Sequence, residues 1–372
     1  MTQLRADAST QMQRLAYLDA LRGFAALYVV VHHVGLMPKP PLPVPDWLKA
    51  FVGFGGSGVT LFFIISGFSM CLSWKRHAAA ASPVESFYAN RLARIAPLFY
   101  FWLVLAIVRD AVFKGPTGQH SAIEIGTNVL LLFNLYEPFQ MGIVWASWTI
   151  GVEMLFYALF PFIKRAGFDN LAKTLLLLAL SLAVVVIARG TTGGATQAGL
   201  PLPLFLFDGL GFFYVLPIFL MGIVTYHVHN ILHFESTNRV RLWLGRLLLP
   251  AAIGALSMLA IYNPTGIIWY YASAVGYGIL LLGFSVWGVN MMVNPFTSYL
   301  GKISYSLYLN HPTLVYILIP VYLAIYNLGL GSIVAFFMGV ALTIIILIPI
   351  SHLTFKFIET PLMAWDKRRS SY

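Results

Sequence analysis

The stretch that decides the fold runs from residue 18 to residue 34 and reads Leu18-Asp-Ala-Leu-Arg-Gly-Phe-Ala-Ala-Leu-Tyr-Val-Val-Val-His-His-Val34. It is apolar enough for a membrane helix, yet it carries Arg22 and, eleven residues later, His33. A helix turns by about 100° and rises by about 1.5 Å per residue, so both side chains lie on one face, roughly 16 Å apart along the axis. Ionisable groups in hydrocarbon cost a few kcal/mol each, which indicates a functional site. A snorkelling arginine and a hydrogen-bonded structural histidine are the alternative.

The composition is that of an integral membrane protein, since 59% of the 372 residues are hydrophobic, 10% are charged, and the mean hydropathy is +0.80. The net charge of +10 comes from basic residues between apolar runs, which the positive-inside rule places in cytoplasmic loops. The basic charge therefore does not point to nucleic acid as a partner. Arg5 and Arg14 precede the first span and no small-residue cleavage site follows it, so we expect a retained helix. The single Cys71 lies in an apolar run and is expected to be a small core residue.

The apolar runs predict an all-α, polytopic fold with about ten transmembrane helices. They span residues 18–37, 51–73, 92–113, 148–163, 174–189, 207–227, 246–262, 267–289, 303–326 and 331–352. An eleventh crossing at 123–136 would put the amino terminus and the basic tail on opposite sides, so we expect that stretch to be short, tilted or re-entrant and buried against protein. The predicted organisation is a cytoplasmic segment 1–17, a membrane domain 18–355 and a basic cytoplasmic tail 356–372. Residues 38–45 and 191–199 are expected to be loops.

Two arginines begin the third span. Arg91 and Arg94 are three residues apart, so they share a helix face and can present two guanidinium forks to one anion such as phosphate. The alternative is that they only hold the helix end at the inner membrane surface. Because nucleotides and coenzyme A are found on the cytoplasmic side, we predict that this pair binds a phosphorylated donor.

Two further polar faces lie within spans. Glu153 and Tyr157 are four residues apart and face the same way, and a carboxylate at that depth needs a partner such as Arg22, His33, His311 or an entering arginine. Such a glutamate either supports a histidine base or only pins helices together. In the other segment, Ser304, Tyr308 and His311 fall at i, i+4 and i+7, a pattern of either packing or substrate contact.

Together these segments resemble the acyltransferase-3 family of multispanning membrane acyltransferases, which includes O-acetylases of bacterial polysaccharides. The resemblance covers nearly the whole chain and rests on six motifs in order: Leu18-Asp-Ala-Leu-Arg22 with His33, Gly58-Val-Thr-Leu-Phe-Phe-Ile-Ile-Ser-Gly-Phe68, Arg91-Leu-Ala-Arg94 with Pro97, Trp148-Thr-Ile-Gly-Val-Glu-Met-Leu-Phe-Tyr157, Gly301-Lys-Ile-Ser-Tyr-Ser-Leu-Tyr-Leu-Asn-His311 and Phe357-Ile-Glu-Thr-Pro361. Thr149 and Thr360 depart from the usual residues at positions without assigned chemistry.

The resemblance implies transfer of an acetyl or other short acyl group from cytoplasmic acyl-coenzyme A to a hydroxyl of a carbohydrate or similar acceptor at or across the inner membrane. It implies that Arg22, His33 and the two spaced arginines are the functional core. No metal is expected. The oligomeric state is left open, and membrane lipid surrounds the protein.

The mechanism that joins these parts assigns one role to each group. Arg91 and Arg94 bind the coenzyme A phosphates, the pantetheine arm runs beside Arg22, and His33 acts as general base or brief acyl carrier. Glu153 orients His33 in this mechanism.

Contacts with the acceptor are assigned to three side chains that share the polar faces of their spans: His311, Tyr157 and Tyr308. Ser66 and His32 are second choices for the reactive group, and His32 points about 80° away from the Arg22 face. The alternative function is a proton-coupled transporter or flippase of an anionic or glycolipid substrate, which would use the same buried groups as a relay.

Overall fold

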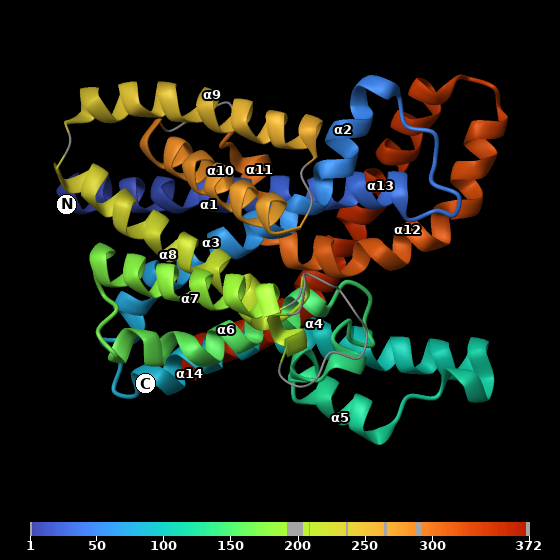
Figure 1. The fold of residues 1–372 in the computed structure, drawn as a ribbon, viewed down its shortest axis with the longest axis horizontal. Coiled ribbons are helices and arrows are strands. Elements are labelled where there is room, and N and C mark those ends of the chain that lie inside the picture. The colour runs from blue at the N-terminus through green and yellow to red at the C-terminus, as the bar shows by residue number, and fades with distance from the viewer. Residues whose placement is uncertain are drawn as a thin grey trace. The chain divides into compact units, whose positions relative to one another are not determined.

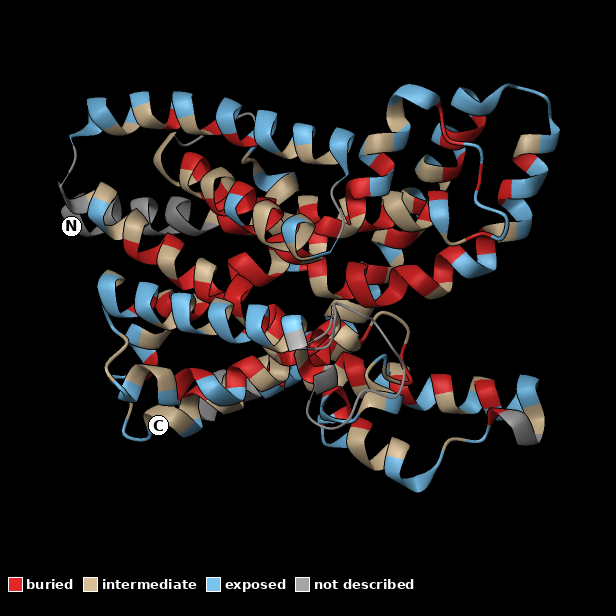
Figure 2. Ribbon diagram, in the orientation of Figure 1, coloured by how far each residue is buried: buried red, intermediate tan, exposed pale blue. Residues whose placement is uncertain are grey.

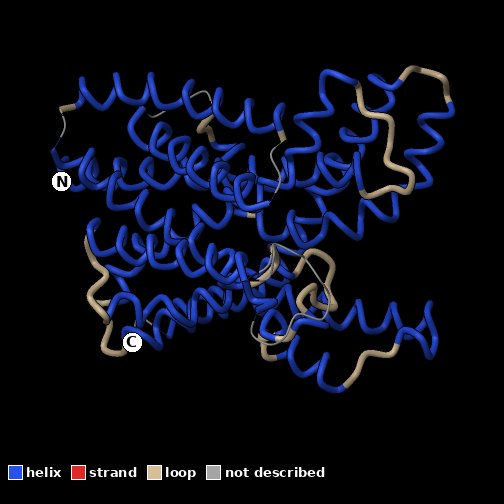
Figure 3. Tube along the Cα trace, in the orientation of Figure 1, coloured by secondary structure: helices blue, strands red, loops and turns tan. Residues whose placement is uncertain are grey.

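The computed structural model describes residues 2–191, 204–207, 209–235, 237–263, 266–287 and 292–369. Within these ranges the secondary structure is helical and contains no β-strand (Figure 3). Eight helical stretches in this described part are long and apolar enough to cross a membrane. The prediction of an all-α, polytopic membrane fold is therefore confirmed.

The helices follow the predicted spans closely. Eight of the ten predicted spans coincide with these apolar stretches, and the other two are the helices α1 (Thr2–Leu36) and α6 (Trp148–Arg165). Both carry charged residues inside their apolar runs, Asp19 and Arg22 in α1 and Glu153 in α6. The helix α1 begins well before the predicted span, so most of the segment 1–17 continues it as helix.

The chain divides into two compact units, and the first consists of Met1–Phe68 and Met221–His352. Its helices, some shared with the second unit, are α1, α2 (Asp46–Phe54), η1 (Gly55–Ser57), α3 (Gly58–His77), α8 (Phe212–Glu235), α9 (Asn238–Tyr262), α10 (Gly266–Trp287), α11 (Pro295–Lys302), α12 (Ser304–Asn327) and α13 (Ser332–Thr354). In this unit α1 packs against α11 and α12, and α9 runs along α10 (Figure 1). Residues 37–45 are not helical, which confirms the loop predicted at 38–45.

Burial within the first unit separates a core from an outer layer. Figure 2 shows α9 mostly exposed, and its exposed side chains include Leu247, Ile253 and Met258. Apolar residues on an outer face are typical of a helix that contacts lipid. By contrast, the first turns of α12 are largely buried, and this is where His311 lies.

A close approach of α1 and α11 builds the part of the core that carries Arg22. A Cβ on Gly23 would lie 2.9 Å from the Cβ of Leu300, and one on Gly301 would lie 1.8 Å from the carbonyl oxygen of Asp19. Only glycine allows the two backbones this contact. The short helix α11 begins with a capping box in which Asn294 accepts from the backbone of Thr297.

The second unit consists of Ser69–Leu220 and Leu353–Tyr372. Besides parts of α3 and α8, it contains α4 (Pro83–Lys114), η2 (Gly115–Gly118), α5 (Ala122–Val129), η3 (Phe133–Leu135), η4 (Glu137–Phe139), α6, α7 (Leu171–Thr191), η5 (Leu204–Phe207), the π-helix η6 (Phe355–Glu359) and α14 (Thr360–Arg369). Here α4 packs against α6, η6 and α14. The side chain of Glu359 is 1% exposed.

The stretch 123–136 is short, as predicted, because α5 has only eight residues and is followed by turns. The prediction that it is buried against protein is wrong for several of its apolar side chains: Ile123 and Leu130 are 65% and 67% exposed. Asn128, Leu131 and Phe133 are buried. Asn128 and Phe133 lie against the turn that precedes α6, at Gly142 and Ile143. The predicted loop at 191–199 lies almost wholly outside the described residues.

Candidate active site

In the first unit, the structure brings together His33 of α1 and His311 of α12. The Nδ1 of His33 lies 3.3 Å from the Nε2 of His311, and the ring centroids are 4.9 Å apart. His33 is half-buried, whereas His311 has no exposed surface. Sequence reasoning placed each residue on a polar face of its own span. It did not pair them, because a contact between helices 278 residues apart has no local signal.

Main-chain carbonyls hold both rings. The Nδ1 of His33 lies 2.9 Å from the carbonyl oxygen of Val29, one helical turn earlier. In the same way, the Nδ1 of His311 lies 2.6 Å from the carbonyl oxygen of Tyr308. Each ring is thereby oriented by the helix that carries it, and the remaining nitrogen of each ring is available for other contacts.

His32, the neighbour of His33, points elsewhere, as the helical periodicity predicts. Its Nδ1 lies 2.8 Å from the carbonyl oxygen of Val52, and its side chain packs against Gly55 and Gly56. A Cβ on Gly55 would lie 2.8 Å from the Cβ of His32, so this packing needs glycine. These contacts make His32 a support for the turn between α2 and α3.

Arg22 keeps the predicted register with His33, because α1 is one uninterrupted helix over both residues. Its Nη1 donates a 2.8 Å hydrogen bond to Asp19, and the arginine side chain is 18% exposed. The ion pair partly neutralises the guanidinium. Arg22 as a contact of the donor stays a prediction.

Tyr308 lies beside the histidine pair. Its ring centroid is 5.5 Å from that of His311 and 5.8 Å from that of Phe62, and it is 7% exposed. Ser304 at the start of α12 is 2% exposed. The predicted polar face of α12 is thus a buried face, and contact of Tyr308 and His311 with the acceptor stays a prediction.

In the second unit, Arg91 of α4 is enclosed by other side chains. It is 9% exposed, and its Nη2 donates a 2.7 Å hydrogen bond to Oγ of Ser73. Its Cζ lies 5.4 Å from the ring centroid of Phe87 and 5.3 Å from that of Tyr157, within the range of cation–π contacts. Sequence reasoning missed Ser73 and Phe87. Phe87 was within reach of it, since it lies four residues before Arg91 on the same helix.

Glu153 completes this group. The Tyr157 hydroxyl donates a 2.5 Å hydrogen bond to the Glu153 carboxylate, which confirms that the two side chains share a face of α6. Glu153 is half-buried and interacts electrostatically with Arg91, the entering arginine among its predicted partners. We call Ser73, Phe87, Arg91, Glu153 and Tyr157 the arginine cluster. That Glu153 also orients His33 stays a prediction.

The turn before α6 fixes where the helix that carries Glu153 begins. The backbone takes a positive φ of 72° at Gly142 and of 63° at Ala146. The Ser147 hydroxyl donates to the carbonyl oxygen of Met141, and the Asn128 side chain accepts from the backbone of Ile143. This loop therefore ends abruptly at Trp148, where α6 begins.

Arg94 differs from Arg91 although it lies one turn further along α4. It is half-buried, and the two guanidinium groups are close enough to repel each other. Of the predicted pair, Arg94 is the member whose side chain remains partly accessible.

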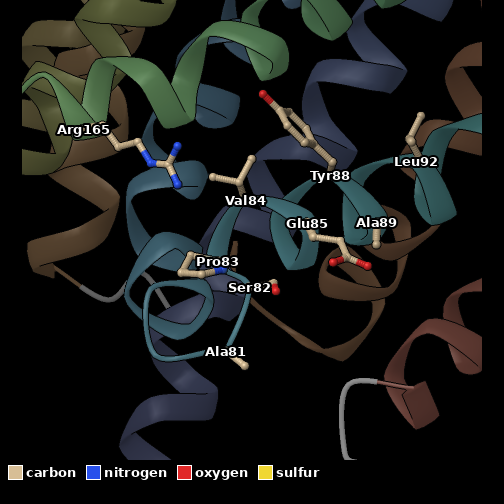
Figure 4. A pocket seen from close by; sticks show the side chains of 9 residues that line it. All are labelled: Ala81, Ser82, Pro83, Val84, Glu85, Tyr88, Ala89, Leu92 and Arg165. Atoms are coloured by element: carbon tan, nitrogen blue, oxygen red, sulfur yellow. The ribbon is translucent and has the colours of Figure 1, made fainter.

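The first turns of α4 also line a cavity of about 820 Å³. Figure 4 shows that Arg165 comes from α6, while the remaining lining residues come from segment 81–92, among them Glu85, Tyr88 and Leu92. The volume is in the range of small-molecule sites. Arg91 and Arg94 are not among the lining residues.

Sequence reasoning also missed an ion cluster at the other end of α4. The buried Asp110 carboxylate accepts from Arg109 and Lys114 at 2.7 and 3.1 Å. His120 lies between two carboxylates, 3.2 Å from Asp110 and 3.0 Å from Glu124. Two acidic residues among three basic ones between positions 109 and 124 were the available signal. The cluster ties the end of α4 to α5.

Of the two second-choice residues, His32 is half-buried and Ser66 is buried. Ser66 is 8% exposed in α3, and Cys71 is 3% exposed, which confirms Cys71 as a core residue. Within the described ranges, no group of three or more His, Cys, Asp or Glu side chains is placed to hold a metal ion.

Comparison with known proteins gives one family and several relatives. The profile of the acyltransferase domain family matches residues 15–352. A protein of Staphylococcus aureus strain COL, provisionally named an O-acetyltransferase, is 24% identical over 94% of this chain and 58% of its own length. The O-acetyltransferase OatA of Staphylococcus aureus strain NCTC 8325 / PS 47 is 24% identical over 47% of this chain and 30% of its own length. The chain thus spans little more than half of the first relative. No solved structure matches it significantly.

Proposed function

The chain belongs to the acyltransferase-3 family, and on this premise we propose that it is a membrane O-acyltransferase. It moves an acetyl or other short acyl group from acyl-coenzyme A to a hydroxyl of a carbohydrate or similar acceptor. The names of the Staphylococcus aureus relatives support acetyl as the group and oxygen as the acceptor atom. In this proposal the protein lies in the inner membrane with both termini in the cytoplasm, where the donor is found.

The observation that carries the proposal is the position of His33. It is a half-buried histidine within an apolar helix, and its Nδ1 is held by the Val29 carbonyl. A histidine held in this way is suited to general base catalysis, which contributes about 10²- to 10⁴-fold to a rate.

The chemical step follows from that role. His33 takes the proton of the acceptor hydroxyl while the oxygen attacks the thioester carbonyl carbon. The carbon–sulfur bond breaks, and the coenzyme A sulfur receives the proton from the imidazolium. In the covalent variant, a ring nitrogen of His33 attacks the thioester carbon and the coenzyme A thiolate leaves. The acceptor hydroxyl then displaces the histidine from the acyl carbon, and its proton passes to the thiolate.

The donor is bound through its phosphates by Arg91 and Arg94 in this proposal, with Arg22 beside the pantetheine arm. The partial exposure of Arg94 supports its direct contact with a phosphate. Ser73, Phe87 and Tyr157 enclose Arg91. This enclosure supports a role in which the positive charge of Arg91 attracts the phosphates without direct contact and its side chain holds α4 in place. The cavity at the start of α4 offers room for part of a large donor on the same helix.

Glu153 and the tyrosines take the supporting roles. Glu153 stabilises positive charge, either on the imidazolium of His33 or on Arg91, and Tyr157 fixes its carboxylate. Of the three side chains predicted to contact the acceptor, Tyr157 and Tyr308 keep that role in this proposal, and His311, which has no exposed surface, is treated separately below.

The test measures product and donor use together. Cells that carry the intact chain or His33→Ala at equal abundance are compared by mass spectrometry for base-labile acetyl groups on surface glycans and small metabolites. The purified protein is given acetyl-coenzyme A, and thiol release is followed. We expect acetylated product and thiol release only with the intact chain. Equal acetylation by both proteins would contradict the role of His33. Movement of a glycolipid or anion across vesicles without thiol release would establish a transporter or flippase.

A further inference from the structure

The hydrogen positions on the two site histidines follow from their neighbours. A main-chain carbonyl oxygen can only accept a hydrogen bond, so a ring nitrogen that faces one carries hydrogen. The Nδ1 of His33 faces Val29, and the Nδ1 of His311 faces Tyr308. In a neutral imidazole one nitrogen donates and the other accepts. Both rings are therefore Nδ1–H tautomers, and both Nε2 atoms carry a lone pair.

The contact between the rings agrees with this assignment. The lone pair on Nε2 of His311 faces the hydrogen on Nδ1 of His33 at a nitrogen–nitrogen distance of 3.3 Å. That hydrogen is shared between His311 and the Val29 carbonyl oxygen. No alternative tautomer of His311 satisfies both of its contacts, since Nε2–H would point at Nδ1–H of His33.

We propose that His311 is a positioning residue for His33, which it holds in the tautomer whose Nε2 takes the proton of the acceptor hydroxyl. The inference rests on the proposed function. When Nε2 of His33 gains the proton, the ring becomes an imidazolium whose Nδ1–H donates to the neutral His311. A hydrogen bond from a charged donor is about twice as strong as a neutral one, so His311 also stabilises the charged state.

Burial distinguishes this role from contact with the acceptor. His311 has no exposed surface, and both of its nitrogens are engaged, one by Tyr308 and one by His33. His33 is partly exposed, and both of its hydrogen-bond contacts involve Nδ1. In the Nδ1–H tautomer its Nε2 carries the lone pair that can take a proton. The reacting atom is thus on α1, and α12 supplies its support.

Nitrogen NMR tests the tautomer directly. The full chain, labelled with ¹⁵N-histidine and reconstituted in lipid, is compared with His33→Gln to assign the His33 signals. We expect a protonated Nδ1 and an unprotonated Nε2 at neutral pH. In His311→Leu, signal from the Nε2–H tautomer should appear. A wild-type His33 with hydrogen on Nε2 would overturn the inference, whether or not the variants fold.

Kinetics tests the role. With acetyl-coenzyme A alone, thiol release by transfer to water needs the base but no acceptor contact. We expect His311→Leu to lower this rate by about 10- to 100-fold with an unchanged KM for acetyl-coenzyme A. His311→Gln keeps an oxygen acceptor and should recover part of the rate. The control is His229→Leu, a histidine of the same unit bonded to Ser285, which should behave as wild type.

The outcomes separate two failures. If His33→Ala keeps its rate, the proposed function fails at its base. The second failure appears if His33→Ala is inactive while His311→Leu keeps the rate of acetyl transfer to water and loses only transfer to added oligosaccharides. His311 would then contact the acceptor, and the positioning role would be wrong.

Discussion

The histidine pair of the first unit and the arginine cluster of the second use ionisable groups in opposite ways. His33 is half-buried, and its tautomer leaves one nitrogen for chemistry. Arg91 is 9% exposed, bonded to Ser73 and flanked by two aromatic rings. Both residues break an apolar helix pattern in the sequence. The contacts around such a residue, and not its presence alone, therefore decide between a reactive group and a structural one.

Removal of the His33 side chain is expected to have the largest effect. We expect His33→Ala to reduce acyl transfer by about 10²- to 10⁴-fold at unchanged protein abundance, because the base is lost. His32→Ala is the matched control and should keep most activity, since His32 serves Val52 and the glycine turn. The measurement is an acylation assay at matched expression. Equal loss in both variants would show that the helical-face argument fails.

The second test distinguishes whether Glu153 supports His33 of the histidine pair or only Arg91 of the arginine cluster. If Glu153 stabilises the imidazolium of His33, Glu153→Gln lowers turnover steeply and leaves the melting temperature nearly unchanged. If it only neutralises Arg91, the variant leaves a buried guanidinium unpaired, which costs about 3 to 5 kcal/mol and appears first as lost stability. Activity and thermal melting on the same preparation decide between them. A normal result in both would remove Glu153 from the site.

The third test divides the arginine pair. We expect Arg94→Ala to weaken binding of acetyl-coenzyme A by about 10- to 100-fold through loss of a charge-assisted phosphate contact, with little change in melting temperature. Arg91→Ala should also lower the melting temperature, because Ser73 and Glu153 lose their partner. Donor titration and melting curves check both. Identical donor affinity and melting temperature in the two variants would contradict the different roles assigned to Arg91 and Arg94.

The smallest effect is expected from keeping the charge and removing the fork. Arg94→Lys should retain part of the donor affinity, because lysine supplies charge without bidentate geometry. Arg91→Lys should recover only a small part of the melting temperature lost in Arg91→Ala, since an ammonium does not match the planar contacts with Phe87 and Tyr157. The double Lys variant with full donor affinity would reduce the pair to membrane anchors.

Features that repeat within one helix were predictable from the sequence. The span positions, the divergence of His32 from His33 and the shared face of Glu153 and Tyr157 all follow from helical periodicity. The partners across helices did not follow: His311 for His33, and Ser73 for Arg91. The short helix α11 and the π-helix η6 were also missed, because eight and five residues give too little periodic pattern.

Two of the groups that orient the histidine pair are the main-chain carbonyls of Val29 and Tyr308. Replacing a side chain leaves a peptide carbonyl in place. A screen of side-chain substitutions therefore reports only on the buried Val29 side chain, although the Val29 carbonyl oxygen sets the orientation of His33. The genetic map of this site will be smaller than the site, and replacing the peptide bond after Val29 by an ester, which weakens that acceptor, is the change that would reveal the missing part.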